Sequence, residues 1–266
     1  PPWEMSAKEI RHDGNKQTIN YKNSWLKIYD KKVFYFPKFF HPDPTVKRQS
    51  GFLIPELSSS NNLGNYLSVP YFKVISENKD LTFTPRFYDK EKIIYQTEYR
   101  QANKNSDHIV DFSIFNKSRL LPQSGKTQAT HFFSKSNFDT NFDFFDNSEI
   151  EIKVQQVSED IYLKTHKLKS PLITSENVLN TKIMLEGSNE NLDLNVSSEV
   201  FEDLSKSDTD RYEYVFPSYN LTRYLESALE GELSFTSIGS SKLYDTNVYE
   251  KTMANNLNYN SLKKIT

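Results

Sequence analysis

The chain has 266 residues, and its 33 basic and 35 acidic side chains nearly cancel, which argues against a nucleic-acid-binding protein. It contains no cysteine, which excludes disulfides, thiol nucleophiles and cysteine-ligated metals. No run approaches the roughly 18 apolar residues of a membrane-spanning helix, and this excludes helical membrane proteins only. The mean hydropathy of -0.69 also suits a transmembrane β-barrel, in which polar and apolar residues alternate.

Residues 1–36 are expected to form short strands, with a turn at Asp13-Gly14-Asn15. Periodicity alone does not separate an ordinary β-meander from the end of a larger β domain. The first residues, Pro1-Pro2-Trp3-Glu4, show no signal-peptide pattern, and we expect the chain to be a piece of a longer protein.

The segment from Val33 to Pro85 places strand-forming residues next to prolines. Proline cannot donate to a β-ladder and normally stays out of sheet interiors, so we expect strands that are edges or that pair weakly. The runs are Val33-Phe34-Tyr35-Phe36-Pro37, Lys47-Arg48-Gln49-Ser50-Gly51-Phe52-Leu53-Ile54-Pro55, Val69-Pro70-Tyr71-Phe72 and Thr82-Phe83-Thr84-Pro85.

From residue 50 onward, extended runs recur between polar turns. Their length of about ten residues is what a tilted strand needs to cross a bilayer. The first group is predicted at 50–58, 66–75, 81–88, 93–102 and 108–116. Within it, Phe83 and Phe87 fall on one face of a strand, and Thr84 and Arg86 on the other.

A second group of strands follows a longer loop predicted at 118–127. These strands are predicted at 129–138, 148–157, 178–185, 192–200, 211–216 and 233–240. Ile150 and Ile152 alternate with Glu149 and Glu151, which indicates that one face is wet. Residues 219–230 also match a helical period, although a strand with a turn is preferred, and 255–266 is predicted to be a loop.

The sequence shows no arrangement typical of a catalytic or metal site. The histidines at 12, 41, 108, 131 and 166 have no ligand spacing, so we expect them at the surface or in loops. Carboxylate pairs such as Glu149 with Glu151 leave a glycosidase open, because such pairs meet in space. Nothing assembles a nucleophile, a base and an orienting group, so we expect no enzyme activity, no metal and no cofactor.

The proline-punctuated runs, together with an Asp-x-Thr-x-Thr-Pro strand at 80–85, resemble the LptD family of lipopolysaccharide-assembly outer-membrane proteins, also called OstA or Imp. Further sequence motifs at residues 157–163 and 211–217 extend this resemblance, which is strongest over residues 33–100. The residues that match the family motif are Ser50, Gly51, Phe52, Tyr71, Asp80 and Pro85.

The resemblance implies an all-β fold. The expected architecture is a partial antiparallel transmembrane β-barrel of about eleven strands, preceded by the last strands of a periplasmic β-jellyroll. The implied domains are residues 1–36, the end of an OstA-like jellyroll, and residues 37–266, the N-terminal half of the outer-membrane barrel.

The resemblance also implies a function. The protein would receive lipopolysaccharide from a periplasmic LptA-like bridge and insert it into the outer leaflet through a lateral gate, with an LptE-like lipoprotein plug and outer-membrane lipids as further partners. Pro55 and Pro70 match the family's gate prolines, and each removes one ladder hydrogen bond, worth about 0.5–1.5 kcal/mol. The family's well-studied members join jellyroll and barrel by disulfides, which this chain cannot form.

Three alternatives remain open from the sequence. The chain could come from another outer-membrane barrel, such as a porin or an iron-complex receptor. It could also be a secreted carbohydrate-binding or hydrolytic β-sandwich, which would bury the apolar sides of its strands against one another. The two prolines could simply blunt a sheet edge against aggregation.

Overall fold

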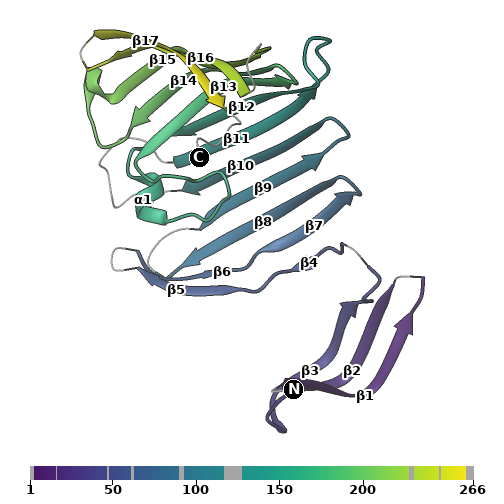
Figure 1. Cartoon of the computed structure of the whole chain (residues 1–266). Helices are drawn as coiled ribbons and strands as arrows, with labels where there is room; N and C mark the ends of the chain where they lie inside the picture. The colour runs from purple at the N-terminus through teal and green to yellow at the C-terminus, as the bar shows by residue number, and fades with distance from the viewer. Residues whose placement is uncertain are drawn as a thin grey trace. The chain divides into compact units, whose positions relative to one another are not determined.

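The structure is a computed structural model that describes residues 3–15, 17–46, 48–60, 63–89, 93–116, 128–227, 231–245 and 247–261 (Figure 1). These residues form seventeen β-strands, one short α-helix and one 3-10 helix, η1 (Asp208–Arg211). Neither helix is long and apolar enough to cross a membrane. The predicted all-β class is confirmed.

The chain divides into two compact units, Pro1–Gly51 and Phe52–Thr266. The first is an antiparallel sheet in the order β1 (Trp3–Asp13), β2 (Thr18–Ile28) and β3 (Lys31–Pro42). The predicted domain boundary between residues 36 and 37 falls inside β3. The assignment of residues 1–36 to a jellyroll stays a prediction.

The second unit is one large antiparallel sheet. The order of the strands follows the chain, because each strand from β8 to β17 pairs with its sequence neighbours. The strands are β4 (Gly51–Phe52), β5 (Glu56–Ser60), β6 (Gly64–Ser68), β7 (Tyr71–Ser76), β8 (Lys79–Tyr88), β9 (Ile94–Ala102), β10 (Ser106–Asn116), β11 (Gln128–Thr140), β12 (Asn147–Val157), β13 (Val178–Asn189), β14 (Leu192–Asp203), β15 (Tyr212–Leu225), β16 (Gly231–Tyr244) and β17 (Val248–Ser261).

Most predicted strands of this sheet are confirmed, although those at 50–58 and 66–75 are each divided in two. β15 continues to Leu225, so the helical alternative over 219–225 is wrong. The loop predicted at 255–266 is wrong over 255–261, because β17 continues to Ser261, and the rest of it lies outside the described residues. Leu257 and Tyr259 alternate with Asn256, Asn258 and Asn260, and this period of two favours a strand despite the polar composition. The loop predicted at 118–127 lies outside the described residues.

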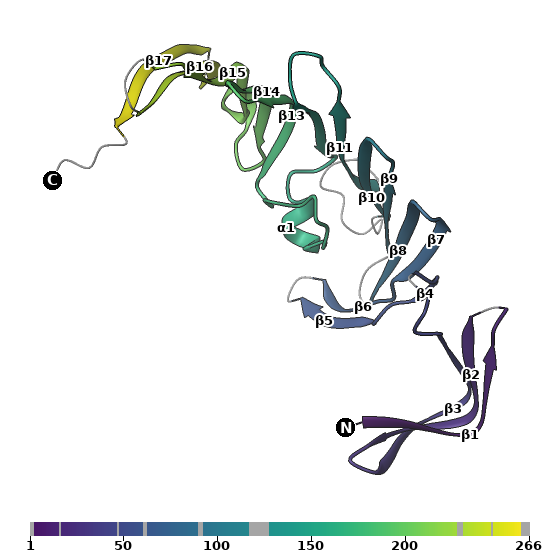
Figure 2. The same cartoon turned by 45° about the vertical axis from the view of Figure 1, so that its right-hand side comes forward.

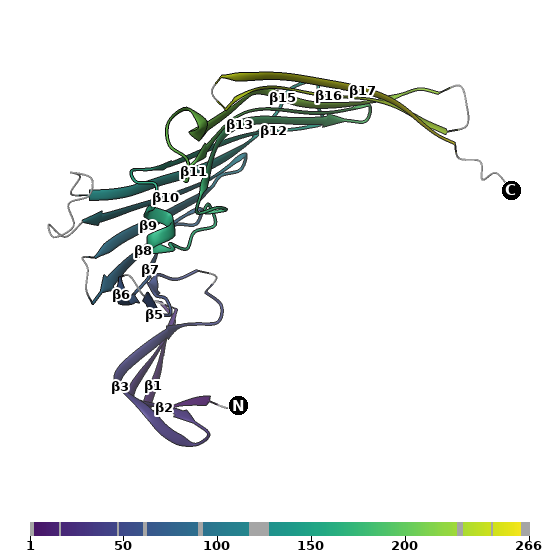
Figure 3. The ribbon, with the colours of Figure 1, turned by 90° about the vertical axis from the view of Figure 1, so that its left-hand side faces the viewer.

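The sheet has fourteen strands in twelve positions, because β6 and β7 share a place beside β8, while β4 and β5 pair with β7 and β6. The prediction was about eleven. Within the described residues the sheet is open, with β17 at one end and β5 at the other. Figure 3 shows that it is curved and that α1 (Tyr162–His166) lies on its concave face.

The two faces of the sheet have opposite polarity. Phe83, Phe112 and Phe132 are 37 %, 37 % and 41 % exposed, whereas Asp80 and Asp111, from the opposite face, are 4 % and 0 % exposed. Soluble sheets bury their apolar face and expose their polar one. This sheet does the reverse at these positions, and the predicted alternation of Phe83 and Phe87 with Arg86 in β8 is confirmed.

Candidate functional site

A cluster of polar side chains is buried on the concave face. His131 Nδ1 lies 2.5 Å from Ser113 Oγ, and His131 Nε2 lies 3.2 Å from Asp111 Oδ2. Gln96 donates from Nε2 to both oxygens of Asp111 at 3.1 Å. The ladder register explains the meeting, because Ser113 of β10 pairs with Gln96 of β9 on one side and with His131 of β11 on the other.

The structure thus brings together a serine, a histidine and an aspartate, which sequence reasoning missed. In a hydrolase triad Nε2 faces the serine and Nδ1 faces the aspartate, but His131 has the reverse arrangement. Ser113 Oγ also lies 2.7 Å from the Tyr162 hydroxyl, and Asp111 and Ser113 are fully buried. A substrate therefore has no access to Ser113, and the cluster acts in packing.

The connection between β12 and β13, residues 158–177, folds onto the same face and is called the inner segment below (Figure 2). It contains α1, whose Tyr162 and Leu163 are each 1 % exposed. The inner segment forms an apolar core with the sheet, whose buried members are Ile94, Phe115, Ala129, Phe133, Tyr162, Leu163, Leu168, Leu172, Leu179 and Leu204. The family-like motif at residues 157–163 lies at the start of this segment, but it did not predict that the segment covers the concave face of the sheet.

Three side chains of the sheet bind backbone carbonyls of the inner segment. Arg86 of β8 donates to the carbonyl of His166 at 2.5 Å, and Gln96 donates to that of Lys169 at 3.1 Å. Gln155 of β12 donates to the carbonyl of Leu172 at 2.7 Å. The three acceptors are spaced three residues apart, so donors from three strands hold a non-regular backbone that would otherwise leave buried carbonyls unpaired.

Two of the five histidines are buried, which corrects the expectation that all lie at the surface or in loops. His131 is 1 % and His166 is 6 % exposed. Burial, with a smaller effect from the charge of Arg86, lowers the pKa of His166 to about 4. His166 is therefore neutral near pH 7, with Nδ1 3.3 Å from the Tyr88 hydroxyl. Among the described residues, no group of His, Asp and Glu side chains could hold a metal ion.

Ion pairs anchor the inner segment at its edges. Arg211 donates to both carboxylate oxygens of Asp160, at 2.9 and 2.7 Å, and to Glu202 at 2.7 Å. The hydrogen bonds from Arg211 hold the pKa of Asp160 below its usual value. Lys169 donates to Glu56 of β5 at 2.8 Å. The segment is thus tied both to the loop after β14 and to the far end of the sheet.

The two predicted gate prolines lie at breaks in the strands. Pro55 lies between β4 and β5, and Pro70 lies between β6 and β7. The predicted strands at 50–58 and 66–75 are each split at these points. Backbone hydrogen bonds persist beside the breaks, from Leu53 to the Pro70 carbonyl at 2.9 Å and from Val69 to the Pro85 carbonyl at 3.1 Å.

The other motif residues surround these breaks. Ser50 precedes β4, Gly51 and Phe52 form it, and the rings of Phe52 and Tyr71 are 5.1 Å apart. Pro85 lies in β8, paired with Tyr95 of β9. Asp80 is 4 % exposed and accepts a hydrogen bond from Arg100 Nε at 2.8 Å.

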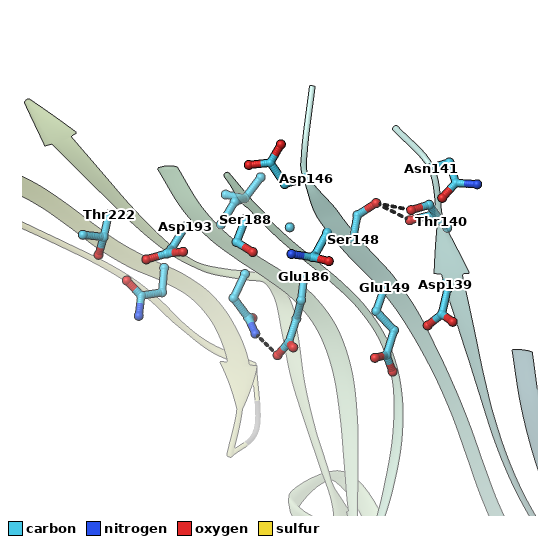
Figure 4. A pocket seen from close by; sticks show the side chains of 15 residues that line it. Asp139, Thr140, Asn141, Asp146, Ser148, Glu149, Glu186, Ser188, Asp193 and Thr222 are labelled. Carbon is cyan, nitrogen blue, oxygen red and sulfur yellow. Dashed lines mark hydrogen bonds between the residues drawn. The ribbon is translucent and has the colours of Figure 1, made fainter. Parts of the chain in front are cut away.

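A hollow of about 650 Å³ opens on the concave face near the turns after β11 and β13 (Figure 4). Its described lining holds five carboxylates and no basic side chain. The carboxylates are Asp139, Asp146, Glu149, Glu186 and Asp193. This end of the inner face is therefore strongly negative.

The large antiparallel sheet turns side chains such as Phe112 and Phe132 outward and buries polar ones such as Asp111 on its concave face, where Ile94, Phe115 and Phe133 pack under the inner segment. This pattern is typical of the walls of transmembrane β-barrels, and over the described residues the sheet is open. The inner segment covers part of its polar face.

The chain is similar to proteins named LPS-assembly protein LptD. It is 32 % identical over 166 residues to that of Pseudoalteromonas translucida (strain TAC 125), covering 61 % of this chain and 21 % of the relative. It is 25 % identical over 186 residues to that of Legionella pneumophila (strain Paris), covering 66 % and 22 %, and 33 % identical over 118 residues to that of Sodalis glossinidius (strain morsitans), covering 44 % and 15 %.

No family model matches the chain. The matches identify it as LptD-like over part of its length, which confirms the predicted resemblance. The matched part spans about a fifth of the length of the first two relatives.

Proposed function

We propose that the chain is part of an outer-membrane protein that inserts lipopolysaccharide into the outer leaflet, without catalysing a reaction. The observation that carries the proposal is the inverted polarity of the large sheet, together with the similarity to LptD. A secreted β-sandwich would bury the apolar side chains that this sheet exposes, and the similarity favours LptD over a porin or a receptor.

The lengths of the connections give the sheet a direction. One rim carries the short turns after β7, β9 and β13, and the other carries the inner segment and the loop between β14 and β15. Bacterial barrels have short periplasmic turns and longer extracellular loops. The first strand of the sheet comes from the side of the short turns, so the chain before it, with the predicted jellyroll end at residues 1–36, would enter from the periplasm.

The lateral gate would lie at the broken strands. Pro55, between β4 and β5, and Pro70, between β6 and β7, each lack a backbone N–H that could donate to a neighbouring strand. The two missing bonds together lower the cost of parting these strands by about 1–3 kcal/mol. An amphipathic lipid could then leave the polar interior sideways.

The test replaces Pro55 and Pro70 together by alanine in the full-length protein. Alanine can donate to the ladder, so the seam should close more tightly and less lipopolysaccharide should reach the cell surface. Pro44→Ala is the matched control, because Pro44 is an exposed turn residue after β3. Unchanged surface lipopolysaccharide in the double variant would contradict the gate.

The partners follow as further proposals. A periplasmic LptA-like bridge would deliver the lipid to the first unit, whose outer strands β1 and β3 offer edges for an added strand. An LptE-like lipoprotein would occupy the interior next to the polar face. Lipids of the outer membrane would contact the exposed apolar face.

A further inference from the structure

Three lysines lie side by side on the concave face, in the middle of the large sheet. In the ladder register, Lys153 of β12 stands opposite Lys135 of β11 on one side and opposite Lys182 of β13 on the other. These three residues are called the lysine row below. Each of the three strands has a paired neighbour on both sides, so the row does not depend on where the sheet begins or ends.

The sheet offsets the positive charge of the lysine row only in part. Like charges directly opposite each other on neighbouring strands are destabilising, because their Cβ atoms are only about 4.5–5.5 Å apart. Glu151, which is 8 % exposed, binds both outer lysines, with one oxygen 2.9 Å from Lys135 Nζ and the other 2.9 Å from Lys182 Nζ. Lys153 is half-buried and makes no ion pair within the described part of the chain. The carboxylate thus fixes the two outer ammonium groups and leaves the central one available to another anion.

A second carboxylate faces the lysine row from β14. Glu199 stands opposite Lys182 in the register, and its two oxygens accept hydrogen bonds from Asn180 Nδ2 at 2.9 Å and from Ser197 Oγ at 2.8 Å. The row and its two acidic neighbours therefore hold three positive and two negative charges. An anion bound at Lys153 would balance this sum and would also relieve the repulsion between the lysines.

The charge of the concave face changes along the strands. Four residues from the lysine row, toward the short turns, Asp139, Glu149 and Glu186 stand opposite one another and line the acidic hollow (Figure 4). Four residues of a strand span about 13 Å. The lysine row thus lies between the acidic hollow and the inner segment, which Gln155, two residues after Lys153, contacts through the carbonyl of Leu172. Positive charge is confined to a narrow band across the strands.

We propose that the lysine row binds an anionic group, a phosphate or a carboxylate, on the sugar part of lipopolysaccharide. Each lysine ammonium has three N–H donors, so the outer lysines keep donors for the anion while they bind Glu151. The charged and polar surroundings suit a sugar and do not suit an acyl chain. The inference rests on the proposed function, because export would bring the sugar part into the polar interior.

The experiment uses the full-length protein in phosphatidylcholine nanodiscs, with a photoreactive phenylalanine derivative in place of Met184. Met184 stands opposite Glu151 in the register, next to the lysine row. The probe is the fluorescently labelled, lipid-free oligosaccharide that mild acid releases from lipopolysaccharide, so labelling does not require the lateral gate. In Lys153→Gln the concentration for half-maximal labelling should rise about ten-fold, because a hydrogen bond to a charged group contributes about 1.5 kcal/mol.

Matched variants separate binding from folding. Lys153→Arg keeps the charge and should keep the labelling. Lys242→Gln removes another lysine, whose Nζ lies 3.5 Å from Glu213, and should leave the labelling unchanged. Lys153→Gln should not make the protein less resistant to denaturant, because it removes a repulsion between like charges.

Two treatments of the oligosaccharide identify the anion. Removal of its phosphates, or reduction of its carboxylates, should abolish the labelling in at least one case, and that case names the group that binds. Labelling that survives both treatments together, that is insensitive to Lys153→Gln, or that falls equally in Lys242→Gln would overturn the proposal. Surface lipopolysaccharide in cells with the Pro55 and Pro70 variants tests the export role separately, so failure of either proposal can be recognised without the other.

Discussion

At the scale of single residues, the structure depends on polar side chains that the sheet buries. Arg86 is 3 % exposed, donates to the carbonyl of His166 and lies 4.3 Å above the ring of Tyr66. Its removal would leave a buried carbonyl without a donor. Such a loss costs more than the net value of one hydrogen bond, because the acceptor stays desolvated.

Arg86→Met should loosen the inner segment by roughly 1.5–3 kcal/mol, the value of a hydrogen bond to a charged group. Hydrogen exchange of residues 158–177 in the full-length protein measures the effect. Lys164→Met is the control, because Lys164 is an exposed residue of α1. Equal exchange in the two variants would show that Arg86 does not hold the segment.

Because His166 is buried, we expect the attachment of the inner segment to the sheet to depend on pH. Its pKa is about 4 on the sheet and about 6.5 when released, so the released form binds more protons between these values. Attachment should therefore be full above pH 6.5 and weaken as the pH falls toward 4, by roughly 3 kcal/mol in total. His166→Gln should abolish this dependence in exchange measurements from pH 7 to 4, and a slope that persists would contradict the role of His166.

At the scale of elements, the strands were largely predictable and the inner segment was not. Ile150 and Ile152 alternate with Glu149 and Glu151, and this period of two correctly predicted the strand β12. The inner segment has no such period, since its shape depends on donors from Arg86, Gln96 and Gln155. These donors are 80, 73 and 17 residues away along the chain from the carbonyls that they bind. The buried cluster of Ser113, His131 and Asp111 depends on the register between β9, β10 and β11, and this register could not be predicted from the sequence.

The clamp between Arg211 and Asp160 should act on the inner segment as an element. Arg211→Gln removes both bonds to Asp160, a contact at the rim where an exposed pair contributes about 1 kcal/mol or less. Hydrogen exchange near residue 160 should rise, and high salt should produce a similar rise in the unchanged protein. Lys206→Gln is the comparison, because its pair with Asp245 is exposed and 4.0 Å long; an equal response would argue against a clamp.

At the scale of the whole sheet, the proposed function depends on which face of the sheet points outward, toward lipid. Composition did not settle this, because a barrel wall and a sandwich both alternate. The burial of Asp111 and His131, combined with the exposure of Phe112 and Phe132, separates the two. Neither the curvature of the sheet nor the partner of its inner face could be predicted from local patterns.

Two adjacent residues of β16 test this orientation. Phe235 pairs with Leu257, on the outward face, and Thr236 pairs with Asn256, on the inner face. In a membrane, Phe235→Arg should cost about 2–4 kcal/mol, the price of a cation near the bilayer midplane, and Thr236→Arg should cost much less. Denaturant unfolding of the full-length protein in lipid vesicles measures both. If the two arginines destabilised the protein equally, the outward face would not be facing lipid, and the gate would lose its physical basis.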